Sequence, residues 1–176
     1  LALCDDSDGG RWHFTVIHEL GWLAYVAGDV AETRRRFQQV LELSQQLNDP
    51  FCSAQAHHCL GVILSTYDDD NEQAHDMYSI AAAEYKACGR MDLYSEVRFH
   101  VQQLSVRRGD LAMAQAGQEE LNTLTAYFPM HVRAWYASAQ TELCILMQRP
   151  GEALTHAAEA LTRFRTMGNR NGECVV

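Results

Sequence analysis

The chain has 176 residues, of which 47% are hydrophobic and 21% charged, a balance typical of a folded globular protein and not of a disordered one. Fourteen Lys and Arg against 23 Asp and Glu give a formal net charge of −9, so the chain lacks the basic surface that nucleic acids and anionic membranes require. Three prolines and eleven glycines are too few for a turn-rich β protein of this length. We therefore expect an all-α protein without direct contact to nucleic acid or membrane.

Helix-breaking residues recur along the chain at nearly equal intervals, which is typical of a repeat protein. Four of them lie 39, 40 and 39 residues apart: Pro50, Gly89, Pro129 and Gly168. A second set falls midway: Gly28-Asp29, Asp68-Asp69-Asp70, Gly109-Asp110 and Arg149-Pro150-Gly151. Each interval therefore holds two helices of roughly 16 to 18 residues joined by a tight turn. We predict about four helix hairpins, at residues 12–48, 51–88, 91–127 and 130–167, in one domain that takes up residues 1–176.

Within the intervals, apolar residues follow the three-and-four spacing of one helix face. Members of this face in the first two intervals are Ile17, Leu20, Gly21, Ala24, Leu60 and Leu64. We expect Leu20 and Leu60 in the core. A short polar side chain before a helix accepts hydrogen bonds from its free N–H groups, which predicts N-caps for second helices at Asp29, Asn71 and Asp110.

The same residues resemble the tetratricopeptide repeat, whose signature is W-x2-L-G-x2-Y followed by A-x3-F. The Leu-Gly pair recurs as Leu20-Gly21 and Leu60-Gly61. The second-helix motif recurs as Thr33-x3-Phe37 and Ala74-x3-Tyr78, and its small residue again as Ala114 and Ala153. Val101 and Gln140 stand at the glycine position of the last two repeats, and the period is near 40 instead of about 34. Long repeats of this kind resemble those of maltose-regulator and LuxR-type large transcriptional regulators and related bacterial signalling proteins.

The resemblance implies a right-handed α-α superhelix, that is, a tetratricopeptide-like solenoid. Gly21 and Gly61 lack a side chain where the paired helix must approach closely, and neighbouring hairpins must stack because one hairpin cannot bury its own apolar face. Residues 1–4 and 170–176 resemble parts of further repeats. We therefore expect a fragment of a larger protein, or a chain that self-associates through uncapped solenoid ends.

Motifs for catalysis, cofactors or metals are lacking. Asp68 to Glu72 has no glycine or glutamate at the positions that a calcium loop requires, and His57 and His58 point about 100° apart on a helix, so they cannot chelate one ion together. The sequence has no glycine-rich phosphate loop and no G-x-S-x-G. We expect no metal, no cofactor, no catalytic residue and no enzymatic activity.

The six cysteines are scattered and contain no CxxC pair. A secreted protein held by disulfides would have denser, patterned cysteines at this length. We therefore expect reduced thiols that fill helix faces, and a cytoplasmic location.

The resemblance also implies a binding surface, because the first helix of each repeat lines the inner groove in that family. The corresponding residues are Thr15, His18, Trp22 and Tyr25, then Gln55, His58, Val62 and Ser65, then Arg98, Gln102 and Ser105, and finally Thr141. Trp22 and Tyr25 with nearby histidines would form a strip suited to a peptide or helix. The alternative is that Trp22 packs against a preceding repeat.

These features favour a scaffold that binds a protein or peptide, as the regulatory segment of a larger cytoplasmic signalling or transcription-control protein. Two alternatives stay open. The repeats can close around a small molecule or signalling peptide as a ligand-sensing domain, or they can serve as a structural self-assembly module.

Overall fold

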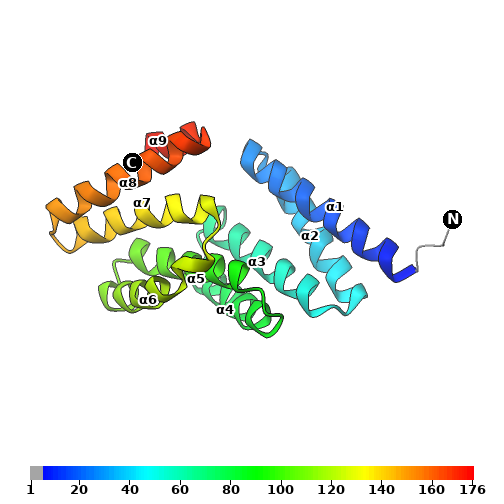
Figure 1. The fold of residues 1–176 in the computed structure, drawn as a ribbon. Helices are drawn as coiled ribbons and strands as arrows, with labels where there is room; N and C mark the ends of the chain where they lie inside the picture. The colour runs from blue at the N-terminus through cyan, green and yellow to red at the C-terminus, as the bar shows by residue number, and fades with distance from the viewer. Residues whose placement is uncertain (1–5) are drawn as a thin grey trace. The chain divides into compact units, whose positions relative to one another are not determined.

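The computed structural model describes residues 6–176, with the side chains of residues 6–8, 171 and 175 left aside. Every regular element in this range is helical (Figure 1). The expected all-α array of helix hairpins is therefore confirmed, while the right-handed superhelix stays a prediction. The chain separates into two compact units, one ending at Arg90 and one spanning Met91–Val176.

The first unit contains two helix hairpins. Its helices are α1 (Asp6–Ala27), α2 (Val30–Leu47), α3 (Pro50–Thr66) and α4 (Asn71–Ala87). Helix α1 pairs with α2 and α3 pairs with α4, and α2 also packs against α3. The hairpins thus stack through α2 and α3, as expected for repeats that cannot bury their apolar faces alone.

The second unit contains two further hairpins and a short terminal helix. Its helices are α5 (Met91–Arg107), α6 (Leu111–Leu124), η1 (Thr125–Tyr127), α7 (Met130–Leu146), α8 (Pro150–Met167) and α9 (Arg170–Val175). Helix α5 pairs with α6, and α7 pairs with α8. One part of its core lies between the α5–α6 pair and α7, where the rings of Phe128 and Tyr136 are 5.0 Å apart. Another part lies between α7 and α8, where the rings of Trp135 and Phe164 are 4.8 Å apart.

The turns lie where the breakers predict them, because each has a local cause. Gly28 and Gly109 adopt left-handed backbone angles (φ +74° and +68°), which cost glycine nothing. The next residue in each turn, Asp29 or Asp110, caps the following helix by accepting a hydrogen bond from its backbone N–H. At the third site the expectation was wrong by one residue: Asp70 is the N-cap, and Asn71 is the first residue of α4.

Helix pairing in the first unit depends on glycine. A Cβ atom on Gly21 would lie 2.5 Å from the ring of Phe37 on α2, and one on Gly61 would lie 2.5 Å from the ring of Tyr78 on α4. The small residues expected at the start of the second helices are all buried: Thr33, Ala74, Ala114 and Ala153. The close approach predicted for both glycines is therefore confirmed.

In the first two hairpins the glycine is on the first helix and the large side chain on the second, whereas the third hairpin has the opposite arrangement. Gln102 stands eight residues before the N-cap Asp110, as Gly21 stands eight before Asp29, whereas Val101 stands nine before it, as Gly61 stands nine before Asp70. The small partner is now on the second helix, because a Cβ on Gly117 would lie 3.0 Å from Gln102. Gln102 therefore lies against α6, while the expected register of the third repeat stays a prediction.

The leucines of the signature are not core residues. Leu20 is 38% exposed, and Leu60 is half-buried. Gly21 and Gly61 face the paired helix, and the preceding residue is turned about 100° around the helix axis, away from that contact. The expectation for both leucines was wrong for this reason.

The residues after Asn169 form a short helix, α9, and their place in a further repeat stays a prediction. Asn169 caps α9, and Gly172 lies so close to Phe164 of α8 that a Cβ would meet its ring at 2.3 Å. The prediction for residues 1–4 falls outside the described residues. Each helix in the described range is too short or too polar to cross a bilayer.

Candidate functional site

The predicted strip of the first unit forms one connected cluster between α1 and α3. Trp22 Nε1 donates to His18 Nε2 at 3.0 Å, and Gln55 Nε2 lies 3.5 Å from the same histidine nitrogen. The ring of Trp22 is 5.6 Å from that of His58 and 5.6 Å from that of Tyr25. The structure therefore brings together the side chains that the resemblance assigns to one surface.

Most of this strip is interior. His18 is 8% exposed, His58 3% and Val62 3%, and Trp22, Tyr25 and Gln55 are half-buried. Thr15 is exposed and hydrogen-bonds to the Arg11 carbonyl. The cluster thus packs the two hairpins together and leaves little free surface for a ligand.

The predicted site residues of the second unit face the paired helix. Arg98 Nε lies 3.0 Å from both carboxylate oxygens of Glu120 on α6. Gln102 is 1% exposed and packs on Gly117 of the same helix. The remaining predicted residues bond locally, Ser65 to Tyr78, Ser105 to Val101 and Thr141 to Ala137.

A groove lies in the second unit between α6 and α8, with α7 as its floor. It consists of two pockets of about 410 and 350 Å³ that share Gln140. The floor residues recur at three- and four-residue spacing along one face of α7: Arg133, Tyr136, Ala137, Gln140, Leu143, Cys144 and Met147. The two pockets therefore follow one another along this face of α7.

The groove is open because α6 turns a polar face toward α7. Helix α6 packs on α5, and α7 packs on α8. The α6 residues beside the groove are all polar: Gln115, Gln118, Glu119 and Asn122. Without apolar side chains to bury, this side of α6 gains little by closing onto α7.

A hydrogen-bonded tyrosine links α7 to α6 where the two pockets meet. The Tyr136 hydroxyl accepts from Gln118 Nε2 and donates to Asn122 Oδ1 at 2.8 Å. Burial of the ring raises the pKa of Tyr136 to about 12, against a smaller opposing effect of Gln118. The phenol therefore stays neutral at physiological pH and acts as a fixed donor and acceptor.

Two buried polar atoms beside the groove have no hydrogen-bond partner among the described residues. They are Gln118 Oε1 on α6 and His156 Nδ1 on α8, and both side chains line the larger pocket. A buried polar atom without a partner is unfavourable. A ligand that donates to Gln118 and hydrogen-bonds with His156 would remove that cost.

Charge differs between the two ends of the groove. Arg133, Arg163 and Glu159 line the end near the start of α7, and Arg163 is paired with Glu159 at 2.7 Å. Arg133 donates from Nε to the Phe128 carbonyl at 3.0 Å, and none of the described carboxylates forms an ion pair with it. Glu119, Glu152 and Arg149 line the other end, where Arg149 lies 3.8 Å from Glu152. The first end thus has one more basic than acidic residue, and the other end has one more acidic than basic residue.

Sequence reasoning missed this groove, although a signal was present. Gln115, Gln118 and Asn122 recur at three- and four-residue spacing, which places three amides on one face of α6. The repeat resemblance directs attention to first helices and to inner positions, whereas this polar face belongs to a second helix.

Ser53, His57 and Glu84 match a catalytic triad in residue type but not in geometry. Ser53 Oγ donates to Glu84 Oε1 at 2.7 Å, and His57 Nδ1 lies 2.9 Å from Glu84 Oε2. The only serine–histidine approach is 3.5 Å, to the same Nδ1 that faces the glutamate. A triad requires the serine on the opposite ring nitrogen from the carboxylate, so this group links α3 to α4 and does not activate Ser53.

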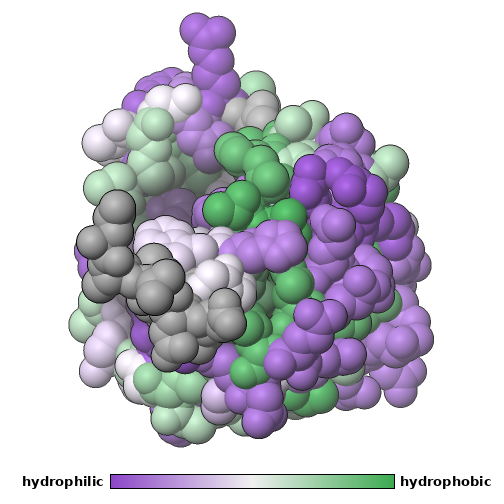
Figure 2. Space-filling model, turned by 90° about the vertical axis from the view of Figure 1, so that its right-hand side faces the viewer, coloured by the Kyte–Doolittle hydropathy of each residue, from purple (hydrophilic) through white to green (hydrophobic). Residues whose placement is uncertain are grey.

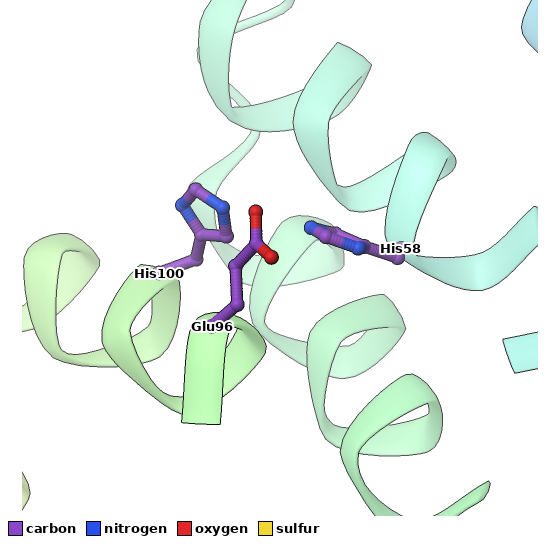
Figure 3. Close-up of side chains that lie close together, drawn as sticks. All are labelled: His58, Glu96 and His100. Atoms are coloured by element: carbon purple, nitrogen blue, oxygen red, sulfur yellow. The ribbon is translucent and has the colours of Figure 1, made fainter. Parts of the chain in front are cut away.

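Glu96 and His100 point from the same side of α5, four residues apart (Figure 3). The third residue drawn there, His58, comes from α3 of the first unit. Within the second unit, Glu96 Oε1 lies 3.3 Å from His131 Nε2 on α7, and this contact raises the pKa of His131. We interpret the contact as an ion pair between α5 and α7 when His131 is protonated.

This ion pair makes the stability of the second unit depend on pH. Because the pKa of His131 is raised in the folded state, its contribution is complete below the unfolded pKa of about 6.5 and is lost as pH rises through the higher folded value. Since His131 is exposed, we expect only about 0.5 kcal/mol. Urea unfolding at pH 6.0 and 8.5 should show this loss in the wild type and not in His131→Gln; equal pH dependence in both would contradict the assignment.

The described cysteines include two that are poor nucleophiles. Burial raises the pKa of Cys52 to about 11 and raises that of Cys59 well above its usual range. Cys88 and Cys174 are exposed, and all described cysteines are free thiols. Cys52 and Cys59 therefore pack as small apolar side chains.

No protein-family model matches the sequence, and no curated protein matches it. The tetratricopeptide resemblance therefore stays a prediction, and the proposed function depends on the geometry of the chain itself.

Proposed function

We propose that this chain is a scaffold that binds an extended peptide in the groove over α7. The observation that carries the proposal is the groove with a partly apolar floor and polar walls in the second unit. Its floor runs from Arg133 to Met147, which at 1.5 Å per residue is about 21 Å of helix. An extended peptide of about six residues has this length.

The chemistry of the walls suits a peptide main chain. Each amide of Gln115, Gln118, Asn122 and Gln140 offers both a donor and an acceptor, as a peptide backbone does. Leu143 and Met147 provide apolar floor for a side chain at one end. The proposal thus keeps peptide binding, but places it on the polar side of α6 and not on the strip around Trp22.

The resemblance to long-repeat regulators supports a setting in the regulatory segment of a larger signalling or transcription-control protein in the cytoplasm. A groove of this kind allows reversible recognition, because its hydrogen-bonding groups are presented by stable helices. No step of the proposal requires a cofactor, a metal or a catalytic residue.

A second function has one observation in its favour. The larger pocket, at about 410 Å³, is the size of a small-molecule site, and it contains the unpartnered atoms Gln118 Oε1 and His156 Nδ1. Sensing of a small polar ligand is therefore the alternative function.

The decisive test is to block the groove with a large side chain and to measure how peptide affinity changes. Peptides selected from a random six-residue display library against the full chain would be measured by fluorescence anisotropy. Gln140 is shared by both pockets, so Gln140→Trp should obstruct the groove and weaken the selected peptides by about tenfold or more. Gln38→Trp is the matched control, because Gln38 is exposed on α2 and outside the groove.

If the selected peptides bind Gln140→Trp as tightly as the wild type, the peptide site does not lie in the groove. Failure to select any peptide, together with a melting shift caused by a polar metabolite that Gln140→Trp abolishes, would favour the sensing function. Concentration-dependent mass in the absence of ligand would favour the self-assembly alternative.

A further inference from the structure

Helix α1 is apolar on two opposite faces, and one of them is exposed. Gly21 marks the face against α2. Half a turn away lies an apolar stripe at three- and four-residue spacing, with the exposed fractions Trp12 69%, Val16 52%, Leu20 38%, Leu23 65% and Val26 77%. We call this set the α1 stripe.

The α1 stripe runs along the exposed side of α1, with one charged residue, Glu19, inside it. Figure 2 shows a band of hydrophobic surface with hydrophilic residues along one side of it. A helix that is apolar all round is normally buried on all sides, and a large contiguous apolar patch usually marks an interaction site. The α1 stripe thus has the properties of a contact surface.

The second hairpin indicates what covers such a stripe. Forty residues on, the positions of Trp12, Val16 and Leu23 correspond to positions on α3 that hold Cys52 (4% exposed), Ala56 (0%) and Ile63 (8%). These residues lie half a turn from Gly61, which faces α4. In the first unit, α2 packs on α3, and α1 reaches α3 through the side chains of Trp22 and Gln55. The preceding hairpin, with α2 in the closest backbone contact, therefore covers α3 in this unit.

Two observations argue against a second copy of the chain as the occupant. Glu19 lies within the α1 stripe with its side chain 66% exposed, so two antiparallel α1 helices would bring two carboxylates together. Helix α8 is the second helix of the last hairpin, so in a second copy it would be the helix that corresponds to α2. Its free face is already occupied by α9, because Gly172 packs against Phe164.

We propose that the α1 stripe binds an amphipathic helix in the way that α2 binds α3. The partner helix places an apolar row at three- and four-residue spacing against Trp12, Val16 and Leu23, and a lysine or arginine opposite Glu19. This site is separate from the groove over α7 and does not depend on the function proposed for it.

The test uses the full chain and one defined probe. The probe is a hydrocarbon-stapled, fluorescein-labelled peptide with the sequence of α2, Val30–Leu47, which contains Arg34, Arg35 and Arg36. A staple is needed because an isolated 18-residue helix is marginal in water. The control probe has the same composition in an order that breaks the apolar row.

Binding is followed by fluorescence anisotropy with three variants. Leu23→Asp should weaken the probe by about tenfold or more, because it puts a charge in the apolar contact. Leu154→Asp is the matched control, since Leu154 is 73% exposed on α8 and should leave the affinity unchanged. Glu19→Gln should weaken binding less than Leu23→Asp and reduce its dependence on salt.

The proposal is overturned by equal binding to wild type and Leu23→Asp, by equal binding of the two probes, or by no binding at about 1 mM protein. Sedimentation gives a further decisive outcome. A dimer of the chain alone that Leu23→Asp abolishes would assign the α1 stripe to a second copy.

Discussion

Replacing Phe37 with alanine is expected to lower the free energy of unfolding by about 3 to 5 kcal/mol, because it leaves a cavity between α1 and α2, the two helices of the first hairpin. Phe37 is fully buried, packs on the backbone of Gly21, and has its ring 5.3 Å from that of Trp22. The measurement is urea unfolding followed by helical circular dichroism.

The matched control for Phe37 is its neighbour. Gln38 is exposed on the same helix, so Gln38→Ala should change stability by less than about 0.5 kcal/mol. A small loss in Phe37→Ala, comparable to the control, would contradict the pairing of α1 with α2 at Gly21.

Replacing Gly61 with alanine is expected to destabilise the first unit by about 1 to 3 kcal/mol, although alanine favours a helix more than glycine does. The added methyl group would lie 2.5 Å from the ring of Tyr78, which cannot move without separating α3 from α4. Thermal unfolding of the two proteins measures the difference.

Gly151→Ala is the control for this substitution, because a Cβ at Gly151 meets nothing within 4 Å. It should leave stability unchanged or raise it slightly. The pair Gly61→Ala and Tyr78→Ala should be non-additive, since removing the ring also removes the clash. Additive losses would show that the methyl group disturbs something other than Tyr78.

The packing of the first unit also explains why the aromatic strip is not open to a ligand. His18 and His58 interact with Trp22, and their rings lie between hairpins that α2 and α3 hold together. In the second unit the corresponding contact between α6 and α7 has polar side chains on one side, and the groove forms there. The two units therefore differ in the surface they offer because one hairpin junction is apolar and the other is amide-rich.

Local chemistry made the helices predictable from the sequence. Gly28 and Gly109 tolerate left-handed angles, Asp29 and Asp110 cap the helices that begin directly after them, and these effects act within a few residues. The glycine contacts of Gly21 and Gly61 were also predictable, because the spacing of a hairpin brings a fixed position of one helix against the next.

Only the tertiary structure decided which polar residues are free. Arg98 was expected in a groove, but Glu120, 22 residues on, draws it toward α6, and Gln102 is buried against Gly117 of the same helix. The groove over α7 depends on which face of α6 meets α7. The spacing of residues within one helix does not predict which of its faces will lie against another helix. The sequence by itself determined where helices begin, end and pair, because those interactions are local or repeat with the period. The binding surface was decided by long-range packing, because burial depends on what lies opposite a side chain in space.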